Sequence, residues 1–361
     1  PGEGALALTG VGVCMPLIMV VSAFAALVGN GGAPRASIFM GKNDTSKAEQ
    51  TLGNCFTMQI IISLILTVIL FLGNRSLLLA FGASANTIDY AVGYMNIYAV
   101  GTIFVQLTLG MNNFITAQGF AKTGMLSVLI GAISNIILDP VFIFGLGPIP
   151  RLEVKGAAIA TVIGQVVTLI LYLIWYFCKD MGLSLGRRNM KLTGEICGKL
   201  YTVGVPCSLT MGLPSLLITV LNGFAAAFSP VYILILGVYF KLQSFIYLPA
   251  NGIVQGMRPI LSYNYGAGEK KRMRRIIQIC SVMILVIMAA GMLLFLLAPG
   301  IIMKLFTADV VTVREGSAAL RIISLGFVVS GVSVICSGAL EALGKGFASF
   351  LISLLRYLAL I

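Results

Sequence analysis

The residues of this chain with the clearest chemical potential are an amide and a carboxyl four positions apart, Asn135 and Asp139, within the apolar run 126–146. Residues at this spacing lie on one face of a helix, so the amide can donate a hydrogen bond to the carboxyl. Pro140 follows, and because proline has no N–H, we expect a local break in the helix with a free carbonyl beside the acid. A carboxyl within lipid is costly unless it is hydrated or paired. We interpret the stretch as a polar site inside a membrane. An aspartate that merely caps the helix break is the alternative.

Such a carboxyl could handle either of two ions. In a partly dry cleft, desolvation favours its neutral form, so it can bind and release a proton near neutral pH. The oxygens of Asp139, together with the amide of Asn135 and the hydroxyl of Thr161, are also hard donors that suit Na⁺. The chain has no His, and its seven Cys form no CxxC pair. We therefore expect no zinc or other transition-metal site, no cofactor and no hydrolase chemistry, and we predict that the protein is not an enzyme.

The composition places these residues in an all-α, polytopic membrane protein. Of the 361 residues, 58% are hydrophobic and only 10% are charged, and the mean hydropathy is +1.01. A soluble globular protein is far less apolar. About ten apolar segments are long enough to be spans or parts of spans. They are residues 5–33, 51–73, 90–117, 123–146, 156–178, 199–226, 231–262, 276–298, 317–342 and 347–361.

The net charge of +12 predicts an orientation in the membrane. When the loops are assigned to the two sides alternately, fifteen Lys and Arg lie on one side and five on the other. Cytoplasmic loops carry such an excess of basic residues. The cytoplasmic loops are then 41–50, 118–123, 179–198, 266–275 and 343–346. We predict a multi-pass protein of the plasma membrane of a prokaryotic type of cell, with the lipid bilayer and no nucleic acid as its partner.

The second half of the chain repeats the first. A shift of 225 residues takes Gly31 to Gly256, Pro34 to Pro259, Gly41 to Gly266, Phe81 to Phe306, Ala117 to Ala342 and Gly119 to Gly344. Both copies run in the same direction, so we predict two parallel-repeat lobes, residues 1–190 and 191–361, divided in the loop 179–198. By the same shift, a complete protein has six helices per lobe, and this chain lacks the first helix and the last part of the second lobe.

Glycine and proline mark the ends of two predicted segments. Gly31 and Pro34 close the first segment, and Gly256 and Pro259 lie at the matching place in the second half. Such residues permit close helix contact or a kink. With Pro140, they are our predicted hinge or packing positions.

Three polar residues of the second half are candidates for a cleft or for substrate binding. Lys241 and Gln243 lie in an apolar segment, where the lysine either lines a hydrated cleft or neutralises an acid. Glu341 is the second acid well within apolar sequence, although Lys345, four residues later, suggests a simple ion pair at a helix end. We expect Arg258 to extend its charge toward the membrane interface.

The chain resembles the multidrug and toxic compound extrusion (MATE) transporters over essentially its whole length, and three groups of motifs carry this resemblance. The motifs are the glycine-rich stretch 29–41, the pair 135–140 and 156–161, and the pair 249–259 and 263–268. The resemblance implies two six-helix lobes around a central cleft and export driven by a proton or sodium gradient. It also implies that Asn135 and Asp139 belong to a cation-handling cluster, completed in the family by an acid on the first helix.

We therefore predict a secondary-active exporter, an antiporter that exchanges small organic, often cationic, compounds for H⁺ or Na⁺ and acts as a monomer. The principal alternative is a lipid-linked saccharide flippase of similar architecture, which would favour several basic side chains in its central cavity. An ATP-driven pump is disfavoured because the sequence has no Walker A motif. A channel fits a two-lobe repeat with a deep carboxylate less well than a carrier does.

Overall fold

The computed structural model describes residues 2–145, 150–178 and 181–360, and every regular element in these ranges is helical. The helices long and apolar enough to span a membrane are α1 (Gly2–Gly41), α2 (Thr45–Ala80), α3 (Ile88–Ala117), α4 (Ala121–Phe144), α5 (Glu153–Cys178), α6 (Gly194–Phe228), α7 (Pro230–Gly266) and α8 (Lys270–Leu297). The pair α10 (Val310–Ser324) and α11 (Phe327–Ala342), bent by 45°, is long and apolar enough for a broken span or a re-entrant loop. The short elements are α9 (Pro299–Lys304), α12 (Gly346–Leu355), a 3₁₀ turn η1 (Arg187–Met190) and a π-helical turn η2 (Arg356–Leu360). The predicted all-α, polytopic fold is confirmed.

The chain forms two compact units. The first holds the chain up to Phe39 and from Asp44 to Gly204, and the second holds Met40–Asn43 and the chain from Val205 onward. Helix α6 thus contributes to both units. The division by contacts lies inside α6, whereas the predicted boundary lies in the loop before it. The lobe limits at 190 and 191 stay a prediction.

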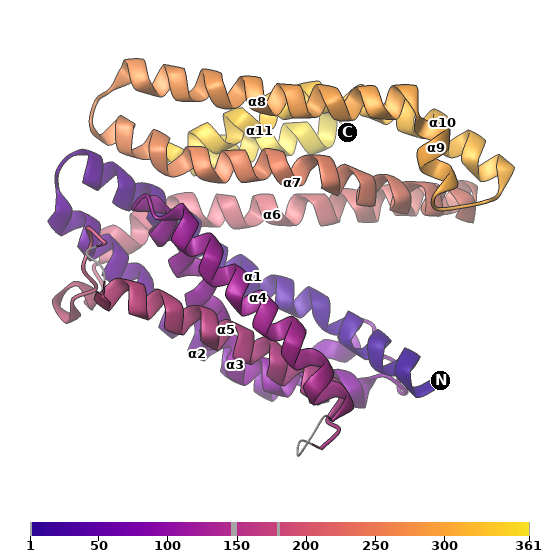
Figure 1. The fold of residues 1–361 in the computed structure, drawn as a ribbon, viewed down its shortest axis with the longest axis horizontal. Helices are drawn as coiled ribbons and strands as arrows, with labels where there is room; N and C mark the ends of the chain where they lie inside the picture. The colour runs from indigo at the N-terminus through magenta and orange to yellow at the C-terminus, as the bar shows by residue number, and fades with distance from the viewer. Residues whose placement is uncertain (1, 146–149, 179–180, 361) are drawn as a thin grey trace. The chain divides into compact units, whose positions relative to one another are not determined.

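In the first unit, α4 and α5 pack backbone to backbone (Figure 1). A Cβ atom at Gly131 would lie 2.6 Å from the carbonyl oxygen of Gly164, and one at Gly164 would lie 2.8 Å from the oxygen of Gly131. At the start of α5, a Cβ atom at Gly156 would lie 2.5 Å from the oxygen of Phe142. Glycine at these positions permits tight packing, because any side chain there would separate the helices.

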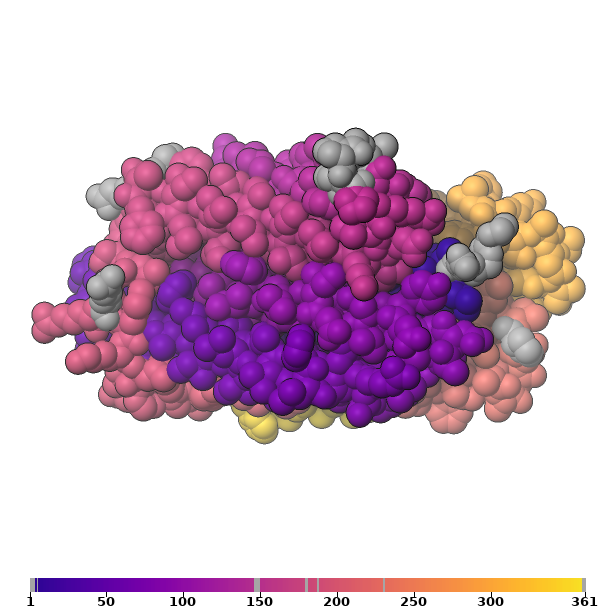
Figure 2. Space-filling model, turned by 90° about the horizontal axis from the view of Figure 1, so that it is seen from below, coloured from indigo at the N-terminus to yellow at the C-terminus, as the bar shows by residue number. Residues whose placement is uncertain are grey.

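The outer surface of this unit is strongly apolar. Figure 2 shows one face, where the purple side chains of residues 45–117 adjoin the magenta to pink ones of residues 121–178. Large apolar side chains stand exposed along these helices, among them Leu72 at 82% and Ile136 at 68%. Only Gly124, Ser127 and Gly131 of α4 are buried. Such a surface is stable in lipid and not in water.

The core of the second unit lies between α7, α8 and α11. In Figure 1, α7 and α8 run side by side and are joined by a short turn. Aromatic rings fill the space between the helices, with the Phe295 and Phe327 centroids 5.4 Å apart and Tyr247 edge-on to Phe327 at 6.0 Å. Tilted and edge-on rings are the favoured arrangements. This packing fixes the orientation of α7 in the second unit.

The helix ends confirm the internal repeat. At a shift of 225 residues, the ends of α1 and α7 coincide, as do the starts of α2 and α8, the ends of α3 and α11, and the starts of α4 and α12. The turns between these helices also match: φ is 59° at Asn43 and 75° at Gly268, and it is 91° at Gly119 and 76° at Gly344. Asparagine and glycine are the residues that adopt this left-handed conformation most readily. The copies differ where straight α3 is matched by the pair α10 and α11, which bends next to Gly326.

Proline does not end these helices. Helix α4 continues through Pro140, where we predicted a local break, to Phe144. Helices α1 and α7 continue through Pro34 and Pro259, where we predicted close helix contact or a kink. Each proline removes one backbone hydrogen bond, but ending the helix inside lipid would leave several groups unpaired. Because α4 runs from residue 121 to 144, Asp139 lies near the end of the helix and not near its middle.

The loop before α6, which contains η1, is held against α2 by hydrogen bonds of α2 side chains, among them those of Glu49, Asn54 and Thr57. Glu49 accepts hydrogen bonds from the backbone N–H (3.0 Å) and hydroxyl (2.6 Å) of Ser184 and from the amide of Asn189 (3.1 Å). The amide of Asn54 donates to the carbonyl oxygens of Asn189 (3.3 Å) and Lys191 (3.0 Å). The loop therefore packs as part of the first unit.

Candidate functional site

The predicted amide and carboxyl pair is present on α4. The Nδ2 atom of Asn135 donates to Oδ1 of Asp139 at 3.3 Å, and both residues are half-buried. The side chain of Asn135 has room because α5 presents Gly164 to it, whose Cβ position lies 3.2 Å from the Cβ atom of Asn135. Pro140 leaves the carbonyl of Ile136 without its helical donor. The acid thus has an amide and a free backbone oxygen on its own helix.

Two further helices bring hydroxyl groups to this pair. Thr161 of α5 donates to its own helix at the Ala157 oxygen, 2.9 Å away, and lies beside the hydroxyl of Tyr94 on α3. Tyr94 is buried and close enough to Asp139 to sense its charge. The structure thus places Thr161 on the side of Tyr94 and records no hydrogen bond from it to Asp139. The three predicted ion-coupling residues share one region of the first unit, and their role in coupling stays a prediction.

A cavity of about 350 Å³ lies one helical turn away from this cluster. Its walls reach Ile143, one turn after Asp139, and Ala157, one turn before Thr161. The other lining residues are Gly4, Ala7, Leu8, Val11, Tyr90, Phe144, Arg151, Glu153 and Val154. Most of the lining is apolar, with charged residues at the end formed by Arg151 and Glu153. Such a space suits a small organic compound next to an acid.

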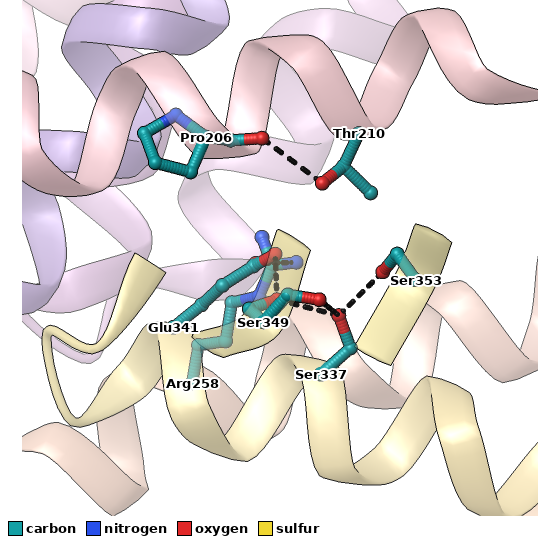
Figure 3. A network of polar contacts seen from close by, with 7 residues as sticks. All are labelled: Pro206, Thr210, Arg258, Ser337, Glu341, Ser349 and Ser353. Carbon is teal, nitrogen blue, oxygen red and sulfur yellow. Dashed lines mark hydrogen bonds and ion pairs between the residues drawn. The ribbon is translucent and has the colours of Figure 1, made fainter. Parts of the chain in front are cut away.

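Glu341 belongs to a buried network in the second unit (Figure 3). One carboxylate oxygen forms an ion pair with Arg258, and the other accepts a hydrogen bond from the Ser349 hydroxyl at 2.9 Å. The Ser349 hydroxyl lies 2.5 Å from that of Ser337, which lies 2.9 Å from that of Ser353. The network joins α7, α11 and α12. In this arrangement both oxygens of Glu341 are already engaged, and its role as a cleft or substrate residue stays a prediction.

The pairing of Glu341 with Lys345 that the sequence spacing suggested is wrong. Helix α11 ends at Ala342, so Lys345 is not on the same helix but caps the start of α12. Arg258, expected at the interface, instead turns inward to the acid. A buried carboxylate requires a partner of opposite charge, and Arg258 supplies it.

Lys241 and Gln243 have different surroundings on α7. Gln243 lines a cavity of about 210 Å³ in the second unit. Lys241 is exposed, and no acid of the described ranges forms an ion pair with it. Neutralisation of an acid, one of the two roles proposed for Lys241, therefore has no support in these contacts. Its placement as a cleft residue stays a prediction.

The predicted hinge residues are all within helices. A Cβ atom at Gly31 would lie 2.7 Å from the Leu200 carbonyl oxygen, so α1 approaches the start of α6 closely there. Its repeat partner Gly256 has open space at the same position. Pro34 and Pro259 lie inside α1 and α7. The close approach is thus seen in one copy of the repeat, and hinge motion stays a prediction.

Sequence reasoning missed two residues of interest. Tyr94 carries a hydroxyl to the Asp139 cluster, and Arg356 is buried with an exposed fraction of 8%. A tyrosine in an apolar segment gives no signal of its own, because most such rings pack in the core. An arginine in an apolar run is a signal that could have been followed.

A family model and the curated relatives of this chain agree with each other. The MatE family model matches residues 2–141 and 206–361. The multidrug export protein MepA of Staphylococcus haemolyticus is 29% identical over 339 residues, which cover 94% of this chain and 74% of that protein. MepA of Staphylococcus saprophyticus is 25% identical over 98% of this chain and 77% of its own length.

Solved structures show the same fold. A MATE crystal structure in the straight conformation superposes with a TM-score of 0.89 at 23% identity, over 99% of this chain and 80% of that one. The outward-facing structure of a multidrug resistance MATE family transporter gives 0.87 at 22% identity, over 99% of this chain and 81% of that one.

Proposed function

Because the chain belongs to the MATE family of membrane transporters, we propose that it is a secondary-active exporter that exchanges small organic compounds for H⁺ or Na⁺. Membership of a transporter family confirms that the protein is not an enzyme. The observation that supports the proposal best is the half-buried Asn135–Asp139 pair, one helical turn from a cavity of about 350 Å³. The names of the staphylococcal relatives support multidrug export as the activity.

The proposed mechanism is competition at Asp139. A carboxylate beside a largely apolar cavity attracts an organic cation, and binding of H⁺ or Na⁺ to the same oxygens removes that attraction. The coupling ion thereby changes the affinity for the compound, which is the differential interaction that a transport cycle requires. Asn135 holds the carboxyl in place, and Tyr94 and Thr161 add hydroxyl groups nearby.

The membrane and the assembly state are part of the same proposal. Basic loops on one side support the predicted orientation. The bacterial origin of the two relatives supports a plasma membrane. We propose a monomer as the working unit.

Ethidium efflux from proteoliposomes tests this function. The protein, expressed at its full encoded length, is reconstituted under an imposed proton or sodium gradient. We expect one gradient to drive efflux and Asp139→Asn to lower the rate at least about tenfold, since the neutral amide cannot exchange an ion. Asp89→Asn is the matched control, because the Asp89 side chain is 84% exposed and pairs with Arg75.

Two results would contradict the proposal. If no cation moves under either gradient, drug export fails, and lipid-linked saccharides become the next substrates to test. If Asp139→Asn transports at the normal rate, Asp139 has a structural role and the coupling site lies elsewhere.

A further inference from the structure

The start of α8 is strongly basic. All but one of the residues 270–275 are Lys or Arg, and their side chains are exposed, namely those of Lys270, Lys271, Arg272, Arg274 and Arg275. We call these residues the basic cluster. The adjacent acid is Glu269, and within the part of the chain that the structure describes no residue of the cluster forms an ion pair. Its positive charge is therefore open to a partner outside the chain.

The basic cluster does not stabilise the helix on which it lies. The N-terminus of a helix carries a partial positive charge, so basic side chains in the first turn are unfavourable there and acidic ones are favourable. The first turn of α8 holds no acid, and the N-cap residue Glu269 makes no side-chain hydrogen bond to it. The charge of the cluster thus has no explanation in the helix itself.

The matching helix of the first half has the opposite arrangement. At the shift of 225 residues, Glu269 corresponds to Asp44 and Arg274 corresponds to Glu49. Asp44 caps α2 by accepting a hydrogen bond from the backbone N–H of Lys47 at 3.1 Å, and it pairs with the Lys47 ammonium at 3.0 Å. Glu49 accepts hydrogen bonds from the loop before α6. The start of the helix is therefore neutralised and covered in the first half, and it is basic and exposed in the second.

The exposed side of α8 continues from the basic cluster into the membrane-spanning part of the helix. At helical spacing, Lys271, Arg272 and Arg275 lie on the same side as a row of exposed apolar side chains. This row consists of Ile279, Val282, Met283, Val286, Leu293, Leu294 and Leu297. An apolar row of this kind is suited to acyl chains, and Ile279 follows Arg275 by one turn. The basic side chains on this side therefore lie where the headgroups of the same lipids begin.

Two tyrosines lie near this level on α7. Tyr263 and Tyr265 are in the last turn of α7, just before the turn that leads into α8, and both are exposed. Tyrosine is enriched at the boundary between lipid and water. The loop 266–275 is one of those that we assign to the cytoplasm, so the leaflet concerned is the cytoplasmic one.

We propose that the basic cluster binds the phosphate groups of anionic phospholipids in the cytoplasmic leaflet. Clusters of four to eight basic residues next to a membrane span are attracted to such lipids, and the planar guanidinium group of arginine matches the geometry of phosphate. The apolar row of α8 gives the acyl chains of the same lipid a surface to lie on. This interaction goes beyond the proposed export function, and it does not depend on which ion or compound is transported.

Photoactivatable phospholipids test the proposal. The purified full-length protein is reconstituted in phosphatidylcholine vesicles that contain a small fraction of photoactivatable phosphatidylglycerol, and the cross-links are located by mass spectrometry. We expect the cross-links to concentrate on residues 269–286. In the triple variant Arg272→Gln, Arg274→Gln and Arg275→Gln, their yield should fall at least about fivefold, because three charges near the headgroups are lost. A phosphatidylcholine probe with the same acyl chains should label this segment weakly in both proteins.

Two further variants keep the test decisive. The triple variant Lys155→Gln, Lys304→Gln and Arg314→Gln removes the same charge from exposed residues on the side assigned to the outside, and it should label like the wild type. Replacement of the three arginines of α8 by lysine keeps the charge and should retain most of the labelling. The glutamine variant of α8 should be at least as stable to heat as the wild type, since it removes unfavourable charge from a helix N-terminus.

Three results would overturn the proposal. They are equal labelling by the two probes, unchanged labelling of the glutamine variant of α8, and displacement of the phosphatidylglycerol probe by glycerol 3-phosphate. The last compound has the phosphate without acyl chains, so its success would identify a soluble anion as the ligand. Since labelling is measured without a gradient, its failure is distinct from a failure of gradient-driven ethidium efflux.

Discussion

At the scale of single residues, the charged side chains inside this protein have three kinds of surroundings. Asp139 keeps an amide partner and stays half-buried, Glu341 is neutralised by Arg258, and Arg356 has no acidic partner in the described ranges. A carboxylate that must exchange an ion cannot be held permanently by an arginine. The difference between the two acids therefore favours Asp139 for exchange and Glu341 for stability.

Removal of the Glu341 carboxylate tests this assignment of ion exchange to Asp139 and of stability to Glu341. Glu341→Gln leaves Arg258 without its counter-charge, and we expect the free energy of unfolding to fall by about 3 kcal/mol. Thermal unfolding of the purified protein measures the change, with exposed Glu269→Gln as the control. The double variant Arg258→Met with Glu341→Leu should recover most of the loss. A stable Glu341→Gln protein without ion-driven transport would show that this assignment of roles is wrong.

At the scale of elements, the loop before α6 differs from the flexible connection that its polar sequence suggests. Glu49 and Asn54 of α2 satisfy backbone and side-chain groups of this loop, including those of Ser184 and Asn189. The loop is therefore part of the first unit. Helix α6, which follows it, continues from the first unit into the second.

Loss of the Glu49 carboxylate tests the attachment of this loop. Glu49→Ala removes three hydrogen bonds, and we expect trypsin to cleave after Arg188 or Lys191 about tenfold faster, because local opening costs less. Cleavage is followed by mass spectrometry on the folded protein. Glu195→Ala, which removes an exposed pair with Lys199, should leave the rate unchanged. An unchanged rate for Glu49→Ala would mean that other contacts hold the loop.

At the scale of the whole molecule, local features were predictable and tertiary ones were not. The repeat could be found from sequence partly because the turns at Gly119 and Gly344 both have positive φ, which glycine tolerates. The continuation of α1 through Pro34 could not be predicted from the sequence, because it depends on the free-energy cost of unpaired backbone groups in lipid. The partner of Glu341 was also hidden, since Arg258 lies on another helix and reaches it only through packing.

The predicted orientation is tested by labelling from one side of the membrane. In a cysteine-free background, Lys345→Cys should be protected from an impermeant maleimide added outside intact cells, and Ser84→Cys should react. The expected difference follows from the excess of basic residues in the loops assigned to the cytoplasm. Both positions are exposed, so access within the protein is matched. The reverse labelling pattern would invert the assignment of every loop.

Helix length has a consequence for the surrounding lipid. Helix α1 has 40 residues and α2 has 36, so at 1.5 Å per residue they are about 60 and 54 Å long. The hydrocarbon layer is only about 30 Å thick. Both helices therefore stay helical well into water, and a change in acyl-chain length moves the lipid boundary along them without reaching an end. Hydrophobic mismatch then changes which side chains meet the headgroups, and the helices themselves need not unwind.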